Sequence, residues 1–232
     1  MKACLIISGG EYCAVPDDMS SAISECEFVI ACDKGLEYAQ EMGIKVDLAL
    51  GDFDSFCGSP EEIECAHCEN DENGKGENGE DGGIGMKVVR LPAEKDDTDT
   101  FFAIKEALKY GYKDIVILCA LGKRLDHEIA NIQSALYAVK NGARVEIIGG
   151  DERLHFFSDG KLTLKKRDGF SLSVFSLTDQ CEGVCERGTK YTLENATLEN
   201  SFPIGVSNEW AEDEAEISVG KGVLLVVESR LR

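Results

Sequence analysis

Basic residues are scarce in this chain. Lys and Arg together number 24, against 44 Asp and Glu, so the 232 residues carry a formal net charge of −20. A surface of this sign repels the phosphates of nucleic acids and of anionic lipid headgroups. We therefore expect neither a nucleic-acid partner nor a membrane partner.

Long apolar stretches are also missing. No stretch approaches the roughly 18 apolar residues that a membrane-spanning helix needs. Residues 1–10 are too short in their apolar part for a secretory signal, and they predict a first β-strand instead. We therefore expect a cytoplasmic protein whose ten cysteines are mostly reduced thiols.

Two common chemical signatures are absent as well. The chain has no G-x-x-x-x-G-K-[ST] segment, which excludes a P-loop enzyme. Soft metal ligands do occur close together at Cys57, Cys65, His67 and Cys68, but their spacing matches none of the usual paired zinc patterns. Whether any cysteine cluster binds a metal stays open at this point.

The first part of the chain, residues 1–150, alternates apolar runs with helical patterns. Apolar runs typical of strands buried on both faces occur at 5–7, 28–32, 46–50, 88–91, 115–120 and 145–148. Helical spacing follows at 36–42, 101–110 and 128–140. This alternation predicts an α/β fold with a mainly parallel sheet covered by helices.

After Gly149-Gly150 the pattern changes to short alternating runs. They lie at 154–157, 161–165, 171–177, 191–193, 215–219 and 223–228. Turns are expected between them, for example at Ser158-Asp159-Gly160 and Arg167-Asp168-Gly169. Several short strands without a helical pattern predict a C-terminal antiparallel β-sandwich over residues 151–232.

Segment 58–85 interrupts the first part. It contains nine acidic residues and one basic residue, and almost no large apolar side chains. Such a segment cannot bury enough surface to offset the entropy lost on ordering, so it predicts a mobile insertion. A cation-binding loop is the alternative, but the acids lack the regular spacing of a calcium loop.

Acidic side chains follow four of the predicted strands, at Asp33, at Asp52 and Asp54, at Asp96, Asp97 and Asp99, and at Asp126. Parallel strands end at one edge of a sheet, so these acids are expected to share a cleft. Clustered carboxylates repel one another, and oxygen ligands favour Mg²⁺ or Ca²⁺. Lys95, Lys123 and Arg124 add positive charge there, which suits a polyphosphate bound against carboxylates. Taken alone, each acid also fits a solvated turn or a helix cap.

Six short motifs in order then carry a family resemblance. They are Asp33-Lys34-Gly35, Gly51-Asp52-Phe53-Asp54-Ser55, Lys95-Asp96-Asp97-Thr98-Asp99, Arg124-Leu125-Asp126-His127, residues 191–198, and Gly205-Val206-Ser207-Asn208-Glu209. On these motifs the chain resembles the thiamine pyrophosphokinase family over nearly its whole length, apart from the acidic segment. Lys34 stands where the resemblance predicts a glycine, which leaves the role of Lys34 open.

The resemblance implies an α/β nucleotide-binding domain, a C-terminal β-sandwich and a homodimer with sites at the subunit interface. The implied reaction transfers the diphosphoryl group of ATP to thiamine, with Mg²⁺, and gives thiamine diphosphate and AMP. The family's catalytic acids correspond to Asp52, Asp54, Asp96, Asp99 and Asp126. Ser207 and Asn208 look like the family's thiamine-contacting pair.

Further roles are hypotheses from the residues themselves. Asp52, Asp54 and Asp99 would hold Mg²⁺, and Arg124 would stabilise charge during transfer. The rest of the ATP site would be Asp33, Ser55, Lys95, Thr98 and His127. Asp96 or Asp126 could accept the hydroxyl proton, and Asp126 could instead bind substrate. Trp210, the only tryptophan, could stack on a cationic ring or pack in a core.

Two other functions compete with this one. A strand followed by D-x-D-S also resembles the haloacid-dehalogenase-type phosphatases, in which the first Asp is a nucleophile. A catalytically inactive thiamine-binding protein is the third possibility, against which the intact set of acids speaks.

Overall fold

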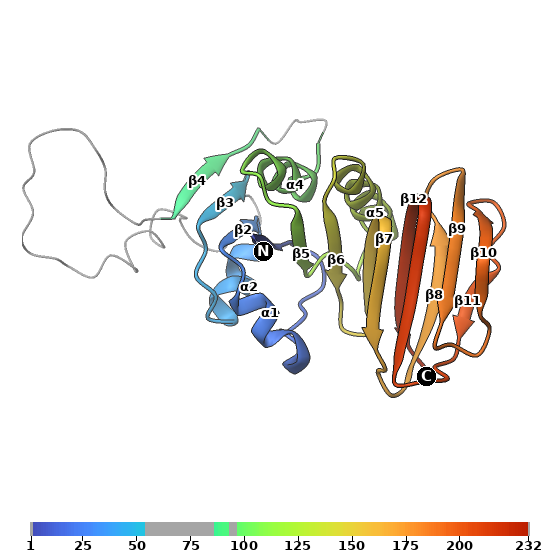
Figure 1. The fold of residues 1–232 in the computed structure, drawn as a ribbon. Coiled ribbons are helices and arrows are strands. Elements are labelled where there is room, and N and C mark those ends of the chain that lie inside the picture. Colours follow the sequence, from blue (N-terminus) through green and yellow to red (C-terminus); the bar gives the residue numbers. More distant parts are fainter. Residues whose placement is uncertain (1, 54–85, 93–96, 232) are drawn as a thin grey trace, which may run out of the picture.

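A computed structural model describes residues 2–53, 86–92 and 97–231 of the chain. Within these residues, twelve strands join into one sheet that runs through the whole molecule (Figure 1). The predicted insertion at 58–85 lies outside the described residues, as do Cys57, Cys65, His67 and Cys68. None of the described helices is both long and apolar enough to cross a membrane.

Six strands form a parallel half-sheet in the order β4-β3-β2-β1-β5-β6. Their bounds are β1 Ala3–Ile7, β2 Phe28–Cys32, β3 Leu48–Gly51, β4 Lys87–Arg90, β5 Asp114–Leu118 and β6 Arg144–Ile148. Each matches one of the apolar runs, because a strand covered on both faces needs apolar side chains on both. The predicted α/β fold with a mainly parallel sheet is confirmed.

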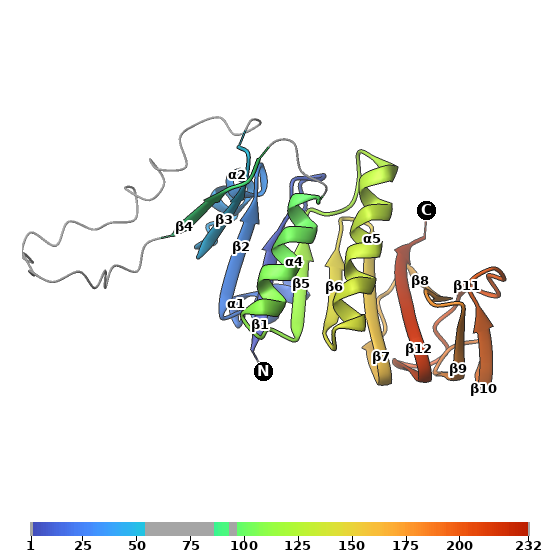
Figure 2. The same cartoon turned by 90° about the horizontal axis from the view of Figure 1, so that it is seen from above.

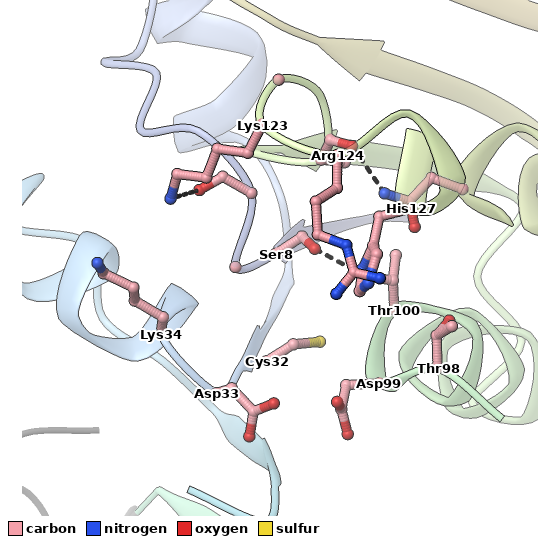
Figure 3. A pocket seen from close by; sticks show the side chains of 15 residues that line it. Ser8, Cys32, Asp33, Lys34, Thr98, Asp99, Thr100, Lys123, Arg124 and His127 are labelled. Atoms are coloured by element: carbon pink, nitrogen blue, oxygen red, sulfur yellow. Dashed lines mark hydrogen bonds between the residues drawn. The ribbon is translucent and has the colours of Figure 1, made fainter. Parts of the chain in front are cut away.

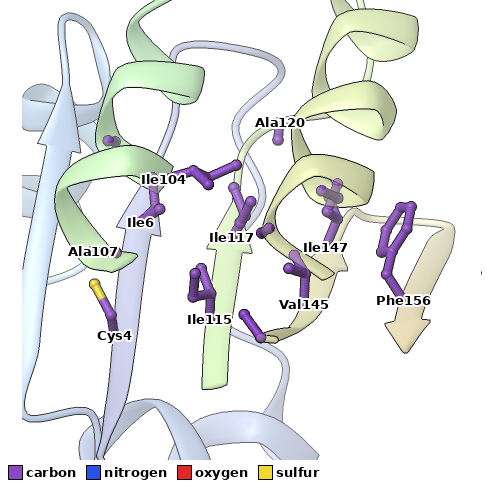
Figure 4. Packing of buried hydrophobic residues seen from close by; sticks show 14 of the residues in the cluster. Cys4, Ile6, Ile104, Ala107, Ile115, Ile117, Ala120, Val145, Ile147 and Phe156 are labelled. Atoms are coloured by element: carbon purple, nitrogen blue, oxygen red, sulfur yellow. The ribbon is translucent and has the colours of Figure 1, made fainter. Parts of the chain in front are cut away.

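Helices cover both faces of this half-sheet. Their bounds are α1 Ser20–Ser24, α2 Gly35–Glu41, α4 Asp99–Lys109 and α5 Leu125–Lys140, and the short 3₁₀ helix η1 Asp17–Met19 precedes α1. Helices α4 and α5 pack Ala103, Ile104 and Ala135 onto one face, where Figure 4 shows the side chains of the first core cluster. Helices α1 and α2 pack Ile23 and Leu36 onto the other face, in a second cluster (Figure 2).

The second half of the sheet is antiparallel. Its strands are β7 Glu152–Lys165, β8 Phe170–Ser176, β9 Gln180–Arg187, β10 Leu193–Glu199, β11 Gly205–Asn208 and β12 Glu214–Arg230. Strand β12 pairs with β7 along one edge, and its other edge pairs first with β9 and then with β8. The sheet therefore divides into two branches, β9-β10 and β8-β11, and a third apolar cluster draws its side chains from both. The predicted antiparallel second part is confirmed.

The turn predicted at Ser158-Asp159-Gly160 is wrong, because β7 continues through these residues. Asp159 (φ 45°) and Gly160 (φ 142°) lie opposite an irregularity in β12, where Val219 pairs with Gly160 and Val223 pairs with Ser158, so the extra residues belong to β12. Extra residues of this kind bend a strand without ending it. The irregularity lies where β12 changes its partner from β9 to β8. The turn predicted at Arg167-Asp168-Gly169 does separate β7 from β8.

The two halves are continuous in both sheet and core. Strands β6 and β7 pair antiparallel across residue 150. Leu154 and Phe156 of β7, with Val223 and Leu225 of β12, belong to the same cluster as α5 (Figure 4). The division of the chain into domains at residue 150 stays a prediction.

Candidate active site

A cavity of about 390 Å³ opens at the carboxyl ends of the parallel strands (Figure 3). Strand order reverses between β1 and β5, and ligands of open α/β sheets bind outside such reversal points. The lining comes from the segments after β1, β2 and β5 and from the starts of α4 and α5. The residues are Ser8, Gly9, Gly10, Cys32, Asp33, Lys34, Thr98, Asp99, Thr100, Ala120, Gly122, Lys123, Arg124, His127 and Asn131.

Asp33 and Asp99 lie opposite one another at the edge of this cavity (Figure 3). Burial, followed by the hydrogen bond and the negative charge of Asp99, raises the pKa of the Asp33 carboxyl to about 7. The nearby charge of Asp52 acts in the same direction, whereas the N–H of Phe53, which donates to Asp33 at 3.2 Å, opposes it. The structure thus brings together three carboxylates from three predicted strand ends.

Gly51 makes room for this arrangement. A Cβ atom on Gly51 would lie 1.7 Å from Oδ1 of Asp33, and the φ of Gly51 is +151°, a conformation that side chains rarely adopt. Asp33 is itself held by its N–H, which donates to the carbonyl of Leu50 at 2.9 Å. A glycine at position 51, the last residue of β3, is therefore needed for the Asp33 carboxylate to lie this close to the backbone of β3.

Two hydroxyls fix the start of α4, where Asp99 is the first helical residue. Thr98 is the N-cap, and its Oγ1 accepts a hydrogen bond from the N–H of Phe101 at 3.1 Å. The hydroxyl of Thr100 hydrogen-bonds that of Ser8 at 2.7 Å, which ties the helix to the end of β1. Asp97 pairs with Lys105 instead of capping the helix.

Basic side chains from α2 and from the β5–α5 loop surround the same cavity (Figure 3). Lys123 donates from Nζ to the carbonyl of Gly10 at 2.7 Å and to the hydroxyl of Tyr38 at 3.3 Å. Arg124 hydrogen-bonds Asp126 from Nε at 3.1 Å, and this bond lowers the pKa of the exposed Asp126 carboxyl. Asp126 is thus paired with Arg124 and does not line the cavity, whereas its neighbour His127 does.

Four predicted site residues, Asp54, Ser55, Lys95 and Asp96, lie outside the described residues. Within the described part of the chain, no three Asp, Glu, His or Cys side chains form a group that could hold a metal ion. Asp52 and Asp99, two of the three predicted metal ligands, are described, and both interact electrostatically with Asp33.

The sequence did not predict several lining residues. Ser8, Thr100 and Asn131 are neutral, and nothing in a single sequence distinguishes such residues from other polar positions. Asn131 donates from Nδ2 to the carbonyl of Ala120 at 2.7 Å, which supports the end of β5. Gly9 and Gly10 follow β1, and a Cβ on Gly10 would lie 2.5 Å from the carbonyl oxygen of Cys119.

The residues predicted to contact thiamine lie elsewhere. Ser207 and Asn208 end β11, which lies at the opposite end of the molecule from β2 and β3 (Figures 1 and 2). Ser207 is exposed and has φ 56°, and its N–H donates to Oγ of Ser173 at 3.0 Å. Trp210 packs against the third cluster and bridges Thr189 through its backbone. Within one chain, these residues do not line the cavity.

Comparisons with known proteins agree over both halves. A model described as "Thiamin pyrophosphokinase, catalytic domain" matches residues 19–147, and one described as "Thiamin pyrophosphokinase, vitamin B1 binding domain" matches residues 161–224. Thiamine pyrophosphokinase of Bacillus subtilis (strain 168) is 27% identical over 230 residues, which are 99% of each chain.

Solved structures give the same result. The crystal structure of thiamine pyrophosphokinase from Bacillus subtilis is similar with a TM-score of 0.80 and 26% identity, over 99% of both chains. That of a thiamin pyrophosphokinase family protein from Enterococcus faecalis has a TM-score of 0.73 and 26% identity, over 100% of both chains. The catalytic-domain model alone matches more than half of the residues of the chain, so the chain belongs to the thiamin pyrophosphokinase family.

Proposed function

We propose that the protein transfers the diphosphoryl group of ATP to the hydroxyl of thiamine, giving thiamine diphosphate and AMP. The observation that carries this proposal is the cavity at the strand reversal, with Asp33, Asp52 and Asp99 gathered beside Lys123 and Arg124. Carboxylates and cations at one cleft suit a polyphosphate substrate, and the family model for the catalytic domain covers these residues.

The nucleotide belongs in this cavity. Asp33, Thr98, Arg124 and His127, four residues of the proposed ATP site, line the cavity, and Ser55 and Lys95 complete the set in the proposal. Arg124 and Lys123 supply positive charge for the phosphates. Lys34, at the N-terminus of α2, adds a further cation on the same wall.

We include Mg²⁺ as the cofactor, held by Asp52, Asp54 and Asp99. The donor set fits, because carboxylate oxygens are the ligands that Mg²⁺ prefers. The pKa of Asp33 is raised first by burial and then by Asp99 and Asp52, whose negative charge a cation relieves. Bound there, Mg²⁺ supplies neutralisation of the β- and γ-phosphates.

The chain's own groups then position the reactants. The hydroxyl oxygen of thiamine bonds to the β-phosphorus while the bond from the β-phosphorus to the AMP oxygen breaks, and Arg124 offsets the charge that develops. Asp96 is the proton acceptor in this proposal. Asp126 suits that role poorly while Arg124 holds it, because the pKa of its carboxyl is lowered. Such transfer depends chiefly on positioning, so a strong base is not required.

We propose a homodimer in which the thiamine surface of one subunit faces the ATP cavity of the other. The surface around Ser207, Asn208 and Trp210 is the thiamine surface in this proposal, and the family model for the vitamin B1 binding domain covers it. They lie far from the cavity of their own chain (Figure 1). Four large apolar side chains nearby are at least half exposed, as expected of an interface, namely Tyr191, Phe202, Ile204 and Val206.

A cytoplasmic location completes the proposal. The seven described cysteines all carry free thiols, the state that a reducing compartment maintains. Cell fractionation with an antibody to the protein tests this point.

One assay tests the function. Protein is incubated with ATP, MgCl₂ and thiamine, with omission of each in turn, and AMP, thiamine diphosphate and free phosphate are measured. AMP and thiamine diphosphate in equal amounts, only when thiamine is present, are the expected result. Free phosphate without thiamine would indicate a phosphatase, and thiamine binding without any product would indicate an inactive binding protein. Size-exclusion chromatography with light scattering on the same preparation tests the dimer.

A further inference from the structure

A buried carboxylate lies between the two branches of the antiparallel half. Glu186 of β9 is 1% exposed, and its Oε1 accepts a hydrogen bond from Nδ2 of Asn208, on β11, at 2.7 Å. The hydroxyl of the buried Thr189 hydrogen-bonds the same carboxylate. Burial disfavours the charged form and raises the pKa of Glu186, so keeping a carboxylate here costs free energy. Its contact with Asn208 indicates why the chain keeps it.

Asn208 uses its whole amide within the protein. Nδ2 donates to Glu186 and, at 2.8 Å, to the carbonyl of Tyr191, while Oδ1 accepts from the N–H groups of Tyr191 and Glu209, both at 3.0 Å. A primary amide has two donors and two acceptor lone pairs, so no capacity is left for a ligand. Asn208 therefore acts as a support that joins β9, the segment around Tyr191 and the end of β11.

The support carries two exposed side chains. Ser207 precedes Asn208 and has φ 56°. This backbone conformation is unfavourable for residues other than glycine, and it persists only when the surrounding structure imposes it. Ser173 holds the N–H of Ser207 on one side, and Asn208 anchors the other. Tyr191 is 65% exposed, and both its backbone groups are bound to Asn208.

We propose that Glu186 is a positioning residue for thiamine. Glu186 holds the amide of Asn208. Asn208 in turn holds the Ser207 turn and Tyr191 in the arrangement that binds the substrate. Ser207 and Tyr191 make the contact, and Glu186 touches no ligand. This inference rests on the proposed function, because it specifies how the thiamine residues of that site are held.

Three variants test the inference in steady-state assays of the full-length protein. Glu186→Ala removes the acceptor for Asn208, and Glu186→Gln keeps an acceptor oxygen of similar shape. Thr189→Val removes the second donor to Glu186 together with the hydrogen bond of 3.4 Å from Oγ1 of Thr189 to the carbonyl of Tyr191. A hydrogen bond to a charged group is worth about 1.5–3 kcal/mol, so we expect Glu186→Ala to raise KM for thiamine at least about tenfold. Its kcat and its KM for ATP should stay within about twofold of wild type, as expected when substrate binding alone is lost.

The other variants separate positioning from general stability. We expect Glu186→Gln to restore KM for thiamine to within about threefold of wild type. We expect Thr189→Val to raise it by about threefold, since its hydroxyl bonds both Glu186 and the carbonyl of Tyr191 while the bond from Asn208 to Glu186 is kept. Ser176→Ala is the matched control, because this buried hydroxyl bonds Thr178 and Cys181 within the same half of the molecule but not Asn208. It should lower the melting temperature and leave KM for thiamine unchanged.

The outcomes decide the inference separately from the function. A folded Glu186→Ala protein with the wild-type KM for thiamine would overturn the inference. So would a fall in kcat that accompanies a rise in KM for both thiamine and ATP. If Glu186→Ala does not fold, the other two variants decide: Thr189→Val with the wild-type KM, or Glu186→Gln with a KM raised tenfold or more, would overturn it. A wild-type protein that makes no AMP from ATP and thiamine would instead refute the proposed function, and this inference with it.

Discussion

Replacing Asp33 by Asn is expected to stabilise the Mg²⁺-free protein at pH 8. Burial is the main cause that disfavours the ionised form of the Asp33 carboxyl, and the neighbouring carboxylates of Asp99 and Asp52 add to it. Asn has nearly the same shape, and its Oδ1 can still accept the hydrogen bond that Phe53 donates to Asp33 at 3.2 Å. The substitution therefore removes one charge from a repulsive group and leaves the packing in place.

The size of the effect follows from the pKa. The pKa of Asp33 rises from an ordinary 3.8 to about 7. Each pKa unit is worth about 1.36 kcal/mol, so the whole change corresponds to about 4 kcal/mol. The side chain is only half-buried and water screens part of its charge, so we expect a gain of about 1–2 kcal/mol in the free energy of unfolding. For a chain of this size, that raises the melting temperature by about 3–6 °C.

The pH dependence has a definite sign. Because the folded-state pKa is raised, the wild-type protein loses this stability as the pH rises from about 4 to about 7. Below that range the carboxyl is protonated in both the folded and unfolded states, and the variant gains nothing. Above it the gain is complete and constant.

Urea unfolding in EDTA, at pH values from 4 to 8, measures this directly. Asp168→Asn is the control, since Asp168 is exposed and remote from the cavity, and its effect should not depend on pH in this way. A gain that is absent at pH 8, or that is equally large at pH 4, would refute the reasoning. Added MgCl₂ should reduce the gain, because the cation relieves the same repulsion in the wild-type protein.

Three further substitutions give simpler expectations. Gly51→Ala should lower both the melting temperature and the rate of AMP formation, because the new Cβ would meet Asp33 at 1.7 Å; Gly43→Ala, with φ +67° and no atom within 4 Å, is the control for backbone strain alone. Thr98→Ala should lose about 1 kcal/mol of stability with the N-cap hydrogen bond, about 2–4 °C in melting temperature, and Thr98→Ser should restore most of it. Asp54→Ala should abolish turnover and leave the circular dichroism spectrum unchanged; undiminished turnover would contradict the proposed metal site.

Much of the fold could be predicted because buried parallel strands have an unmistakable composition. The apolar runs placed all six parallel strands, and Gly43 and Gly111 follow α2 and α4 closely. The antiparallel half was harder to predict. Ser158-Asp159-Gly160 has the composition of a turn, and only pairing with β12 on one side keeps β7 continuous through it.

The candidate site could likewise be predicted only in part. Acids at strand ends could be predicted to gather, since parallel strands share an edge, and Asp33 and Asp99 do lie together. The partner of Asp126 could not be predicted, because an exposed carboxylate in the first turn of a helix can pair with any cation within reach, and here that is Arg124. The full use of the hydrogen-bonding groups of Asn208 could not be predicted either, because its partner Glu186 lies 22 residues away on another strand.

The sequence by itself determined the six parallel strands with helices α2, α4 and α5, the acids at the strand ends and the family. These depend on residue type and local spacing, which the sequence states directly. Only the tertiary structure decided the raised pKa of Asp33, the buried position of Glu186 and the separation of the Ser207 turn from the cavity. Each of these depends on distances between residues far apart in the chain, and electrostatic and hydrogen-bond energies are set by those distances and by burial.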